Sequence, residues 1–176
     1  PDGSDGSPAV LRAVALAILH IAAREPSTLL EQSMAWARLA LDDSDWVVRQ
    51  SAAAVLGDSA SDKATALLSK LLHDPEARVR RSAVRALARH SDHAAMLALR
   101  DGLTDADSSV RSETVQALGK LAQALQRLGV PGLLSEAQTW LRDVVERGSP
   151  QEQLLAASTL LRLGDTERAA LRDLER

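Results

Sequence analysis

An internal repeat with a fixed period is the feature of this sequence that most limits its possible folds. Residues 43–57, 74–88 and 105–119 align without gaps, each copy 31 positions after the one before. Four columns are identical in all three copies: Asp43, Asp74 and Asp105; Val48, Val79 and Val110; Arg49, Arg80 and Arg111; Leu56, Leu87 and Leu118. Periods of about 20–50 residues are typical of repeat architectures, in which similar units stack on one another. The sequence therefore predicts a stack.

Within each copy the apolar residues are spaced as on one side of an α-helix. In the second copy Val79, Ala83 and Leu87 fall at i, i+4 and i+8. A second helix with inward leucines is predicted ahead of Asp74 and another ahead of Asp105. The Asp columns stand where helix-capping residues are expected, since a carboxylate can accept from the unpaired amides of a first helical turn.

Extending this pattern outward predicts an all-α chain. The expected helices cover residues 8–24, 28–42, 46–57, 62–72, 76–90, 93–103, 107–128, 134–147, 151–163 and 165–175. We therefore expect a right-handed α-solenoid of about five helical hairpins, formed as one domain by residues 8–176 and clearest at 43–119. Residues 1–7, which are rich in Gly, Ser and Asp, predict a flexible linker within a longer polypeptide.

Composition removes several classes of function. The chain has no Cys, which excludes disulfides, thiol nucleophiles and thiolate metal sites and favours a cytoplasmic location. No apolar run is long enough to cross a bilayer, so no membrane partner is expected. There is no Gly-rich phosphate loop, no nucleophile elbow and no His-Glu-x-x-His motif. We therefore expect a protein that is not an enzyme and holds no cofactor.

Two groups of residues carry weak resemblances to metal sites. His90 and His93 flank Asp92, but the group straddles an expected turn, and Asp92 is better placed to cap the next helix. The Asp-rich stretches at 42–45 and 105–107 lack the central Gly and the terminal Glu of a calcium loop. We expect caps and turns at these places, and no bound metal.

The repeated columns resemble a known family. An Asp and an Arg separated by five residues, with Val before the Arg and then Ala and Leu-Gly, resemble HEAT repeats, in particular the short repeats of phycobilisome-lyase-like proteins. The resemblance implies that Asp43, Asp74 and Asp105 form a ladder of hydrogen bonds between neighbouring repeats with Arg49, Arg80 and Arg111. Ser149 and Leu155 stand at about these places in the last repeat, so the ladder is expected to be missing there.

A stripe of arginines distinguishes the helix expected at 76–90. Arg78, Arg81, Arg85 and Arg89 are spaced to lie on one face of it. The equivalent positions of the other copies hold Val47, Gln50, Ala54 and Asp58, and Ser109, Ser112, Gln116 and Lys120, so the fold does not require Arg there. In HEAT-like stacks the second helix of each pair lines the concave side, which implies that the stripe faces a groove. It is either a solvated face or a binding site.

Tryptophan is the chain's sole aromatic residue type. Trp46 occupies a column that otherwise holds Ala77 and Ser108, so it either covers the N-terminal helices or anchors a partner. Trp36 is expected in the core, and the pattern assigns no role to Trp140.

These observations predict a non-enzymatic scaffold that presents a concave groove, with the Arg stripe and Trp46, to an acidic or extended protein segment. One alternative is a nucleic-acid-binding or DNA-repair HEAT module, which a pI near 5.8 and a net charge of −3 disfavour. The family resemblance adds a second alternative, a chromophore lyase. Because HEAT-like proteins have many activities, the resemblance implies shape more than activity.

Overall fold

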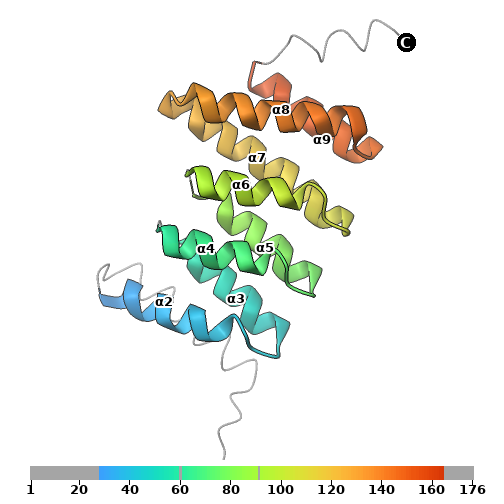
Figure 1. Ribbon diagram of the computed structural model, residues 1–176. Coiled ribbons are helices and arrows are strands. Elements are labelled where there is room, and N and C mark those ends of the chain that lie inside the picture. Colours follow the sequence, from blue (N-terminus) through green and yellow to red (C-terminus); the bar gives the residue numbers. More distant parts are fainter. Residues whose placement is uncertain (1–27, 60, 91, 165–176) are drawn as a thin grey trace, which may run out of the picture. The chain divides into compact units, whose positions relative to one another are not determined.

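The computed structural model describes residues 28–59, 61–90 and 92–164, and every regular element in these ranges is an α-helix (Figure 1). The helices are α2 (Thr28–Ala40), α3 (Trp46–Gly57), α4 (Asp62–Leu71), α5 (Ala77–Leu87), α6 (His93–Gly102), α7 (Ser108–Leu128), α8 (Pro131–Arg147) and α9 (Pro150–Arg162). The linker expected at 1–7 and the helices expected at 8–24 and 165–175 lie outside the described residues. Among those described, no helix has both the length and the apolar character needed to cross a bilayer.

The chain divides into two compact units, with the boundary between Ala86 and Leu87 at the end of α5. In the first unit α3 packs against both α2 and α4. Its core is aliphatic, with Val48, Leu56, Leu68 and Val79 at most 3% exposed. Trp36, which was expected in this core, is only half-buried.

The second unit is built around α7, which packs against α6, α8 and α9. Val110, Leu118 and Leu141 are fully buried in its core. Helices approach closely at two small residues. A Cβ at Gly102 would lie 2.5 Å from Thr114 Oγ1, and one at Gly119 would lie 2.6 Å from Thr159 Cγ2. These glycines therefore set how near α6 and α9 come to α7.

The connection between α7 and α8 is shorter than the sequence pattern predicted. Gly129 ends α7 with a left-handed backbone (φ 68°), and Pro131 is the first residue of α8, where a missing amide hydrogen costs nothing. The helix expected to begin at residue 134 therefore begins three residues earlier. Gly129 and Val130 thus form a two-residue corner between the helices instead of a longer break.

The Asp columns lie two residues ahead of the helix caps, so the capping role expected for them is wrong. Asp45 caps α3 and Asp107 caps α7, each accepting from an amide at 2.8 Å. The column carboxylates instead fold the loop before the cap. Asp43 accepts from the amide of Asp45, Asp74 from that of Glu76 and Asp105 from that of Asp107, at 2.8, 2.9 and 2.8 Å.

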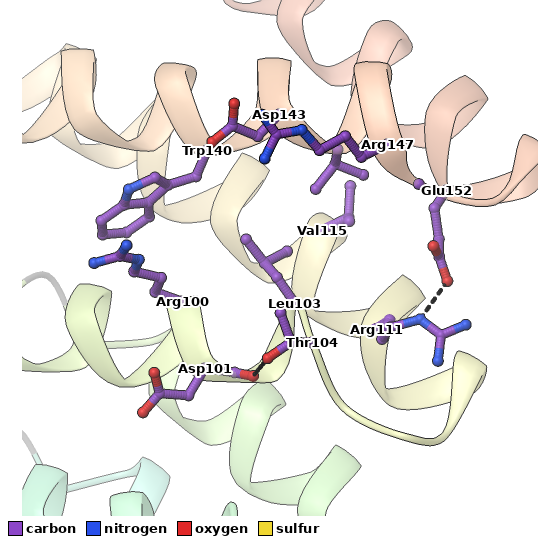
Figure 2. Close-up of a pocket in the computed structure, with 12 residues that line it drawn as sticks. Arg100, Asp101, Leu103, Thr104, Arg111, Val115, Trp140, Asp143, Arg147 and Glu152 are labelled. Carbon is purple, nitrogen blue, oxygen red and sulfur yellow. Dashed lines mark hydrogen bonds and ion pairs between the residues drawn. The ribbon is translucent and has the colours of Figure 1, made fainter.

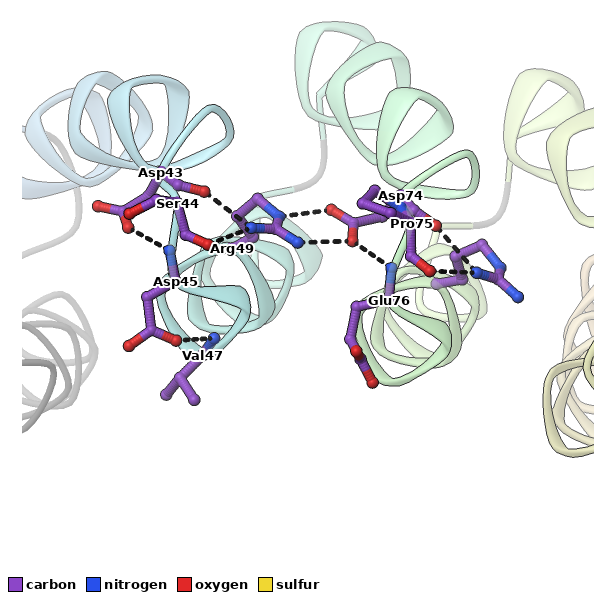
Figure 3. A network of polar contacts seen from close by, with 9 residues as sticks. Asp43, Ser44, Asp45, Val47, Arg49, Asp74, Pro75 and Glu76 are labelled. Atoms are coloured by element: carbon purple, nitrogen blue, oxygen red, sulfur yellow. Dashed lines mark hydrogen bonds and ion pairs between the residues drawn. The ribbon is translucent and has the colours of Figure 1, made fainter.

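The arginines of the repeated column hold the same loops by hydrogen bonds to their carbonyls, whereas the aspartates bond loop amides (Figure 3). Arg49 Nη1 donates to the carbonyl oxygens of Asp43 and Ser44, at 2.8 and 3.1 Å. Arg80 and Arg111 repeat this pair of bonds on Asp74 and Pro75 and on Asp105 and Ala106. Each guanidinium thus donates to loop carbonyls that accept no hydrogen bond within a helix. It thereby fixes the turn that leads into its own helix.

Arg49 also joins its repeat to the next one. Its Nε and Nη2 donate to the two carboxylate oxygens of Asp74, at 2.6 and 2.9 Å. The two side chains are only 12% and 5% exposed, and the pairing is bidentate, the strongest arrangement for these groups. In Figure 3 the Arg49 guanidinium lies between the loop of its own repeat and Asp74 of the next.

The second unit contains an equivalent pair, which corrects the expectation that the last repeat has no ladder contact. Arg111 Nε donates to Glu152 Oε1 at 2.8 Å, and Glu152 Oε2 accepts from the amide of Ser149 at 3.0 Å. Glu152 therefore bonds a guanidinium and a loop amide, as Asp74 does. It can do so from the first turn of α9 because its longer side chain reaches back to the cap in a capping box.

Both carboxylates have a lowered pKa. Burial alone would raise the pKa of Asp74, but the hydrogen bonds from Arg49 and from the Glu76 amide outweigh it. Burial would likewise raise the pKa of Glu152, and the hydrogen bonds from the Ser149 amide and Arg111 reverse the direction. The charged forms of both groups are therefore stabilised by folding.

We expect that replacing Arg49 by Met will lower the free energy of unfolding by about 3–5 kcal/mol, because Asp74 would stay buried without its charge partner. Urea unfolding followed by circular dichroism measures this change. Arg38→Met, which removes an exposed Arg of α2, is the matched control and should change stability little. Equal stabilities for the two variants would contradict the role assigned to the Arg49–Asp74 pair.

We also expect stability to fall in acid. Since folding lowers both pKa values, the two carboxylates contribute fully above their ordinary values near pH ~4 and lose that contribution as pH falls through the lowered values. Urea unfolding at a series of pH values should show a flat free energy near neutrality and a decline below about pH 4. The Asp74→Asn, Glu152→Gln double variant should decline less steeply, and an unchanged slope would refute this account.

Candidate functional site

Helix α5 carries a cationic face in the first unit. The helix holds Arg78, Arg80, Arg81 and Arg85 and no acidic residue. Arg80 turns back to the loop carbonyls, whereas Arg78 and Arg85 are exposed and Arg81 is half-buried. We call Arg78, Arg81 and Arg85, together with Trp46, the α5 cationic face.

Arg89 does not extend this face, although the sequence pattern placed it there. Helix α5 ends at Leu87, and the chain then turns, with the amide of His90 donating to the carbonyl of Leu87 at 3.0 Å. Arg89 lies in that turn, so the helical spacing that relates it to Arg85 no longer applies. The expected stripe of four arginines therefore has three members on the helix.

Trp46 and Arg78, two of the residues expected to bind a partner, contact each other. The guanidinium carbon of Arg78 lies 4.8 Å from the centroid of the Trp46 ring, and Arg78 Nε is 3.7 Å from Glu76 Oε1. Trp46 is the first residue of α3 and is half-buried. A cation–π contact of this kind orients the guanidinium while leaving its N–H edges able to bind a carboxylate. The helix that Trp46 was otherwise expected to cover, 8–24, lies outside the described residues.

A hydrogen bond joins α3 and α5 in the same unit. Gln50 Nε2 donates to Ser82 Oγ at 3.0 Å. Gln50 is the residue of α3 equivalent to Arg81, so the first copy of the repeat has a neutral side chain where the second has a cation. The positive charge of the α5 cationic face is therefore a property of this one helix.

The second unit contains a cleft of about 540 Å³ that the sequence analysis missed (Figure 2). Its walls come from α6, α7, α8 and the start of α9. Trp140 of α8 lies beside Arg100 of α6, with the guanidinium carbon 5.5 Å from the centroid of the ring. The two residues are far apart in sequence and belong to no repeated column. The one signal was that Trp140 is the only aromatic residue of α8 in a chain with three.

One end of this cleft is formed by the Arg111–Glu152 pair. Because each of those charges already binds the other, the groups able to meet a ligand are at the rim. They are two cations and two anions, all exposed: Arg100, Arg147, Asp101 and Asp143. The rim therefore has no excess of either charge, unlike the α5 cationic face.

Asp92 and His93, two residues of the His90–His93 group, contact α6 and α8. Asp92 caps α6, accepting from the amide of Ala95 at 2.7 Å, as the sequence analysis predicted. His93 Nε2 lies 3.8 Å from Glu136 Oε2 of α8. Within the described ranges, no three His, Cys, Asp or Glu side chains are grouped so that they could hold a metal ion.

Comparison with known proteins identifies the repeats. The family model described as HEAT repeats matches residues 33–119, a range that contains all three copies of the 31-residue pattern. A search of curated proteins found no significant match. HEAT repeats are generally protein-interaction scaffolds and are typically not catalytic. The closer likeness to phycobilisome-lyase-like repeats stays a prediction. The all-helical structure of the described residues and this match together show that residues 33–119 are HEAT repeats and that the fold class is the α-solenoid.

Proposed function

We propose that this chain is a non-enzymatic protein-interaction scaffold, and that the α5 cationic face binds an acidic or extended segment of a partner protein. The observation that carries the proposal is the contact of Arg78 with the ring of Trp46, 4.8 Å from its centroid, at the start of a helix whose outer face continues with Arg81 and Arg85. Tryptophan and arginine are two of the residue types most enriched in protein-binding hot spots.

The charge of α5 favours an acidic ligand. The helix has four arginines and no acidic residue, while the chain as a whole has a net charge of −3. Guanidinium groups bind carboxylates through two parallel hydrogen bonds, which gives orientation as well as attraction. A segment with several Asp or Glu residues would pair with successive arginines along the helix.

The same observations favour a peptide over nucleic acid. A surface that binds nucleic acid usually spreads its cations over several elements, because each phosphate neutralised adds to affinity. Here the equivalent positions of α3 and α7 hold Val47, Gln50 and Ala54 and Ser109, Ser112 and Gln116, all uncharged. The cationic surface is therefore about one helix long, which suits a short segment of protein.

Reversing two charges of this face tests the proposal. In the Arg81→Glu, Arg85→Glu variant, we expect the Kd for a fluorescein-labelled polyglutamate peptide to rise about tenfold or more, since each lost charge-assisted contact is typically worth 1.5–3 kcal/mol. Fluorescence anisotropy at low ionic strength measures the Kd, and circular dichroism checks helicity.

The matched control is Lys120→Glu, Arg127→Glu, which makes the same change of charge at two exposed positions of α7. It should change the Kd much less than the α5 variant does. Equal effects of the two variants would reduce the interaction to net charge and refute the proposed site. A DNA duplex that binds the parent more tightly than the peptide, with a steep salt dependence, would favour the nucleic-acid function instead.

A further inference from the structure

The cleft of the second unit differs chemically from the α5 cationic face. Its rim carries Arg100 and Arg147 beside Asp101 and Asp143, whereas α5 carries cations alone. None of these four side chains forms a hydrogen bond or an ion pair with another described residue, and the only contact shown for Arg100 is its position over Trp140. All four charges therefore remain able to meet groups of a ligand.

The inner surface of the cleft is apolar. Val115 of α7 is 1% exposed and forms part of its wall, with Leu103 after α6 and Val144 of α8, both half-buried, beside it. The ring of Trp140 lies at one end of the group of lining residues, as Figure 2 shows. A volume of about 540 Å³ lies within the range of protein ligand sites, about 300–1,000 Å³. An aliphatic side chain inserted here would cover Val144 and Trp140 from water.

The contact between Arg100 and Trp140 prepares the site for a carboxylate. The five N–H donors of a guanidinium lie in the plane of that group. When its face lies over an indole ring, its edges can still bind a carboxylate through two parallel hydrogen bonds. Because the ring limits the rotamers of Arg100, less conformational entropy is lost when a ligand binds. Asp101 and Asp143, in turn, provide acceptors for a cation of the same ligand.

We infer that this cleft binds a short segment of a partner protein in which an aliphatic residue lies between a carboxylate and a cationic side chain. The inference rests on the proposed function in that the ligand is a protein, but it concerns a separate surface with a different charge requirement. A polyanion would bring its negative groups against Asp101 and Asp143 and is disfavoured here. The two surfaces would therefore select two different kinds of segment.

The indole N–H groups of Trp46 and Trp140 allow the two surfaces to be tested separately in one experiment. The sample is the full chain labelled with ¹⁵N, and Trp46→Phe and Trp140→Phe variants assign the two indole signals. Three kinds of capped peptide are titrated: peptides with a leucine between a lysine and a glutamate, in both orders; their counterparts with serine in place of the leucine; and polyglutamate.

We expect the leucine peptide, in at least one order, to shift the Trp140 signal in a saturable way. The serine peptide should bind about tenfold more weakly, because it forfeits the burial of an aliphatic side chain. Arg100→Gln should raise the Kd of the leucine peptide about tenfold. Arg127→Gln, an exposed arginine of α7 outside the cleft, is the matched control and should leave the Kd unchanged.

Two results would overturn the inference: a Trp140 signal that neither leucine peptide shifts, or a Trp140 signal that polyglutamate shifts at lower concentration than they do. Failure of the proposed function has a different signature, since polyglutamate would then leave the Trp46 signal unchanged. Either surface can thus be rejected without affecting the result for the other.

Discussion

A guanidinium that serves two repeats at once is the interaction on which the rest of this structure depends. Arg49 bonds the loop carbonyls of its own repeat and the carboxylate of Asp74 in the next, and Arg111 does the same with Asp105, Ala106 and Glu152. In a repeat protein each unit contacts only its neighbours, so such a pair fixes the register of one unit against another. Buried charges of this kind are costly unless every donor and acceptor is satisfied, and here loops and carboxylates satisfy them together.

This arrangement separates the positions that hold the fold from those that can vary. The Val and Leu columns fill the core and the Arg column fastens the loops, and these positions are the same in all three copies. The outer positions of the helices neither fill the core nor fasten the loops, so their residues can differ between copies. For this reason α3 has Gln50 where α5 has Arg81. The positions that differ between copies therefore lie on the outer faces, and the arginines and Trp46 of the α5 cationic face are residues that no other copy repeats.

The sequence predicts well the structural roles of residues that recur in each copy, and poorly the contacts that occur only once in the chain. The period and the helical spacing of Val48, Val79 and Val110 predicted their burial, and the family model agrees over residues 33–119. Glu152 was missed because alignment at a fixed period looks for an Asp in the loop as the carboxylate that accepts from the Arg. A Glu has a longer side chain and can reach the same Arg from inside the helix. The contact of Arg100 with Trp140 was missed because it depends on how α6 and α8 pack, which a local pattern does not encode.

The two oxygens of Glu152 have a consequence for the dynamics of α9. One oxygen accepts from the amide of Ser149, the residue that caps the helix, and the other accepts from Arg111 of α7. Fraying of the first turn of α9 would move the side chain that bonds Arg111, and loss of Arg111 would in turn leave the cap with a half-satisfied carboxylate. We therefore expect local melting of α9 to be coupled to its detachment from α7, so that this end of the second unit opens in one step.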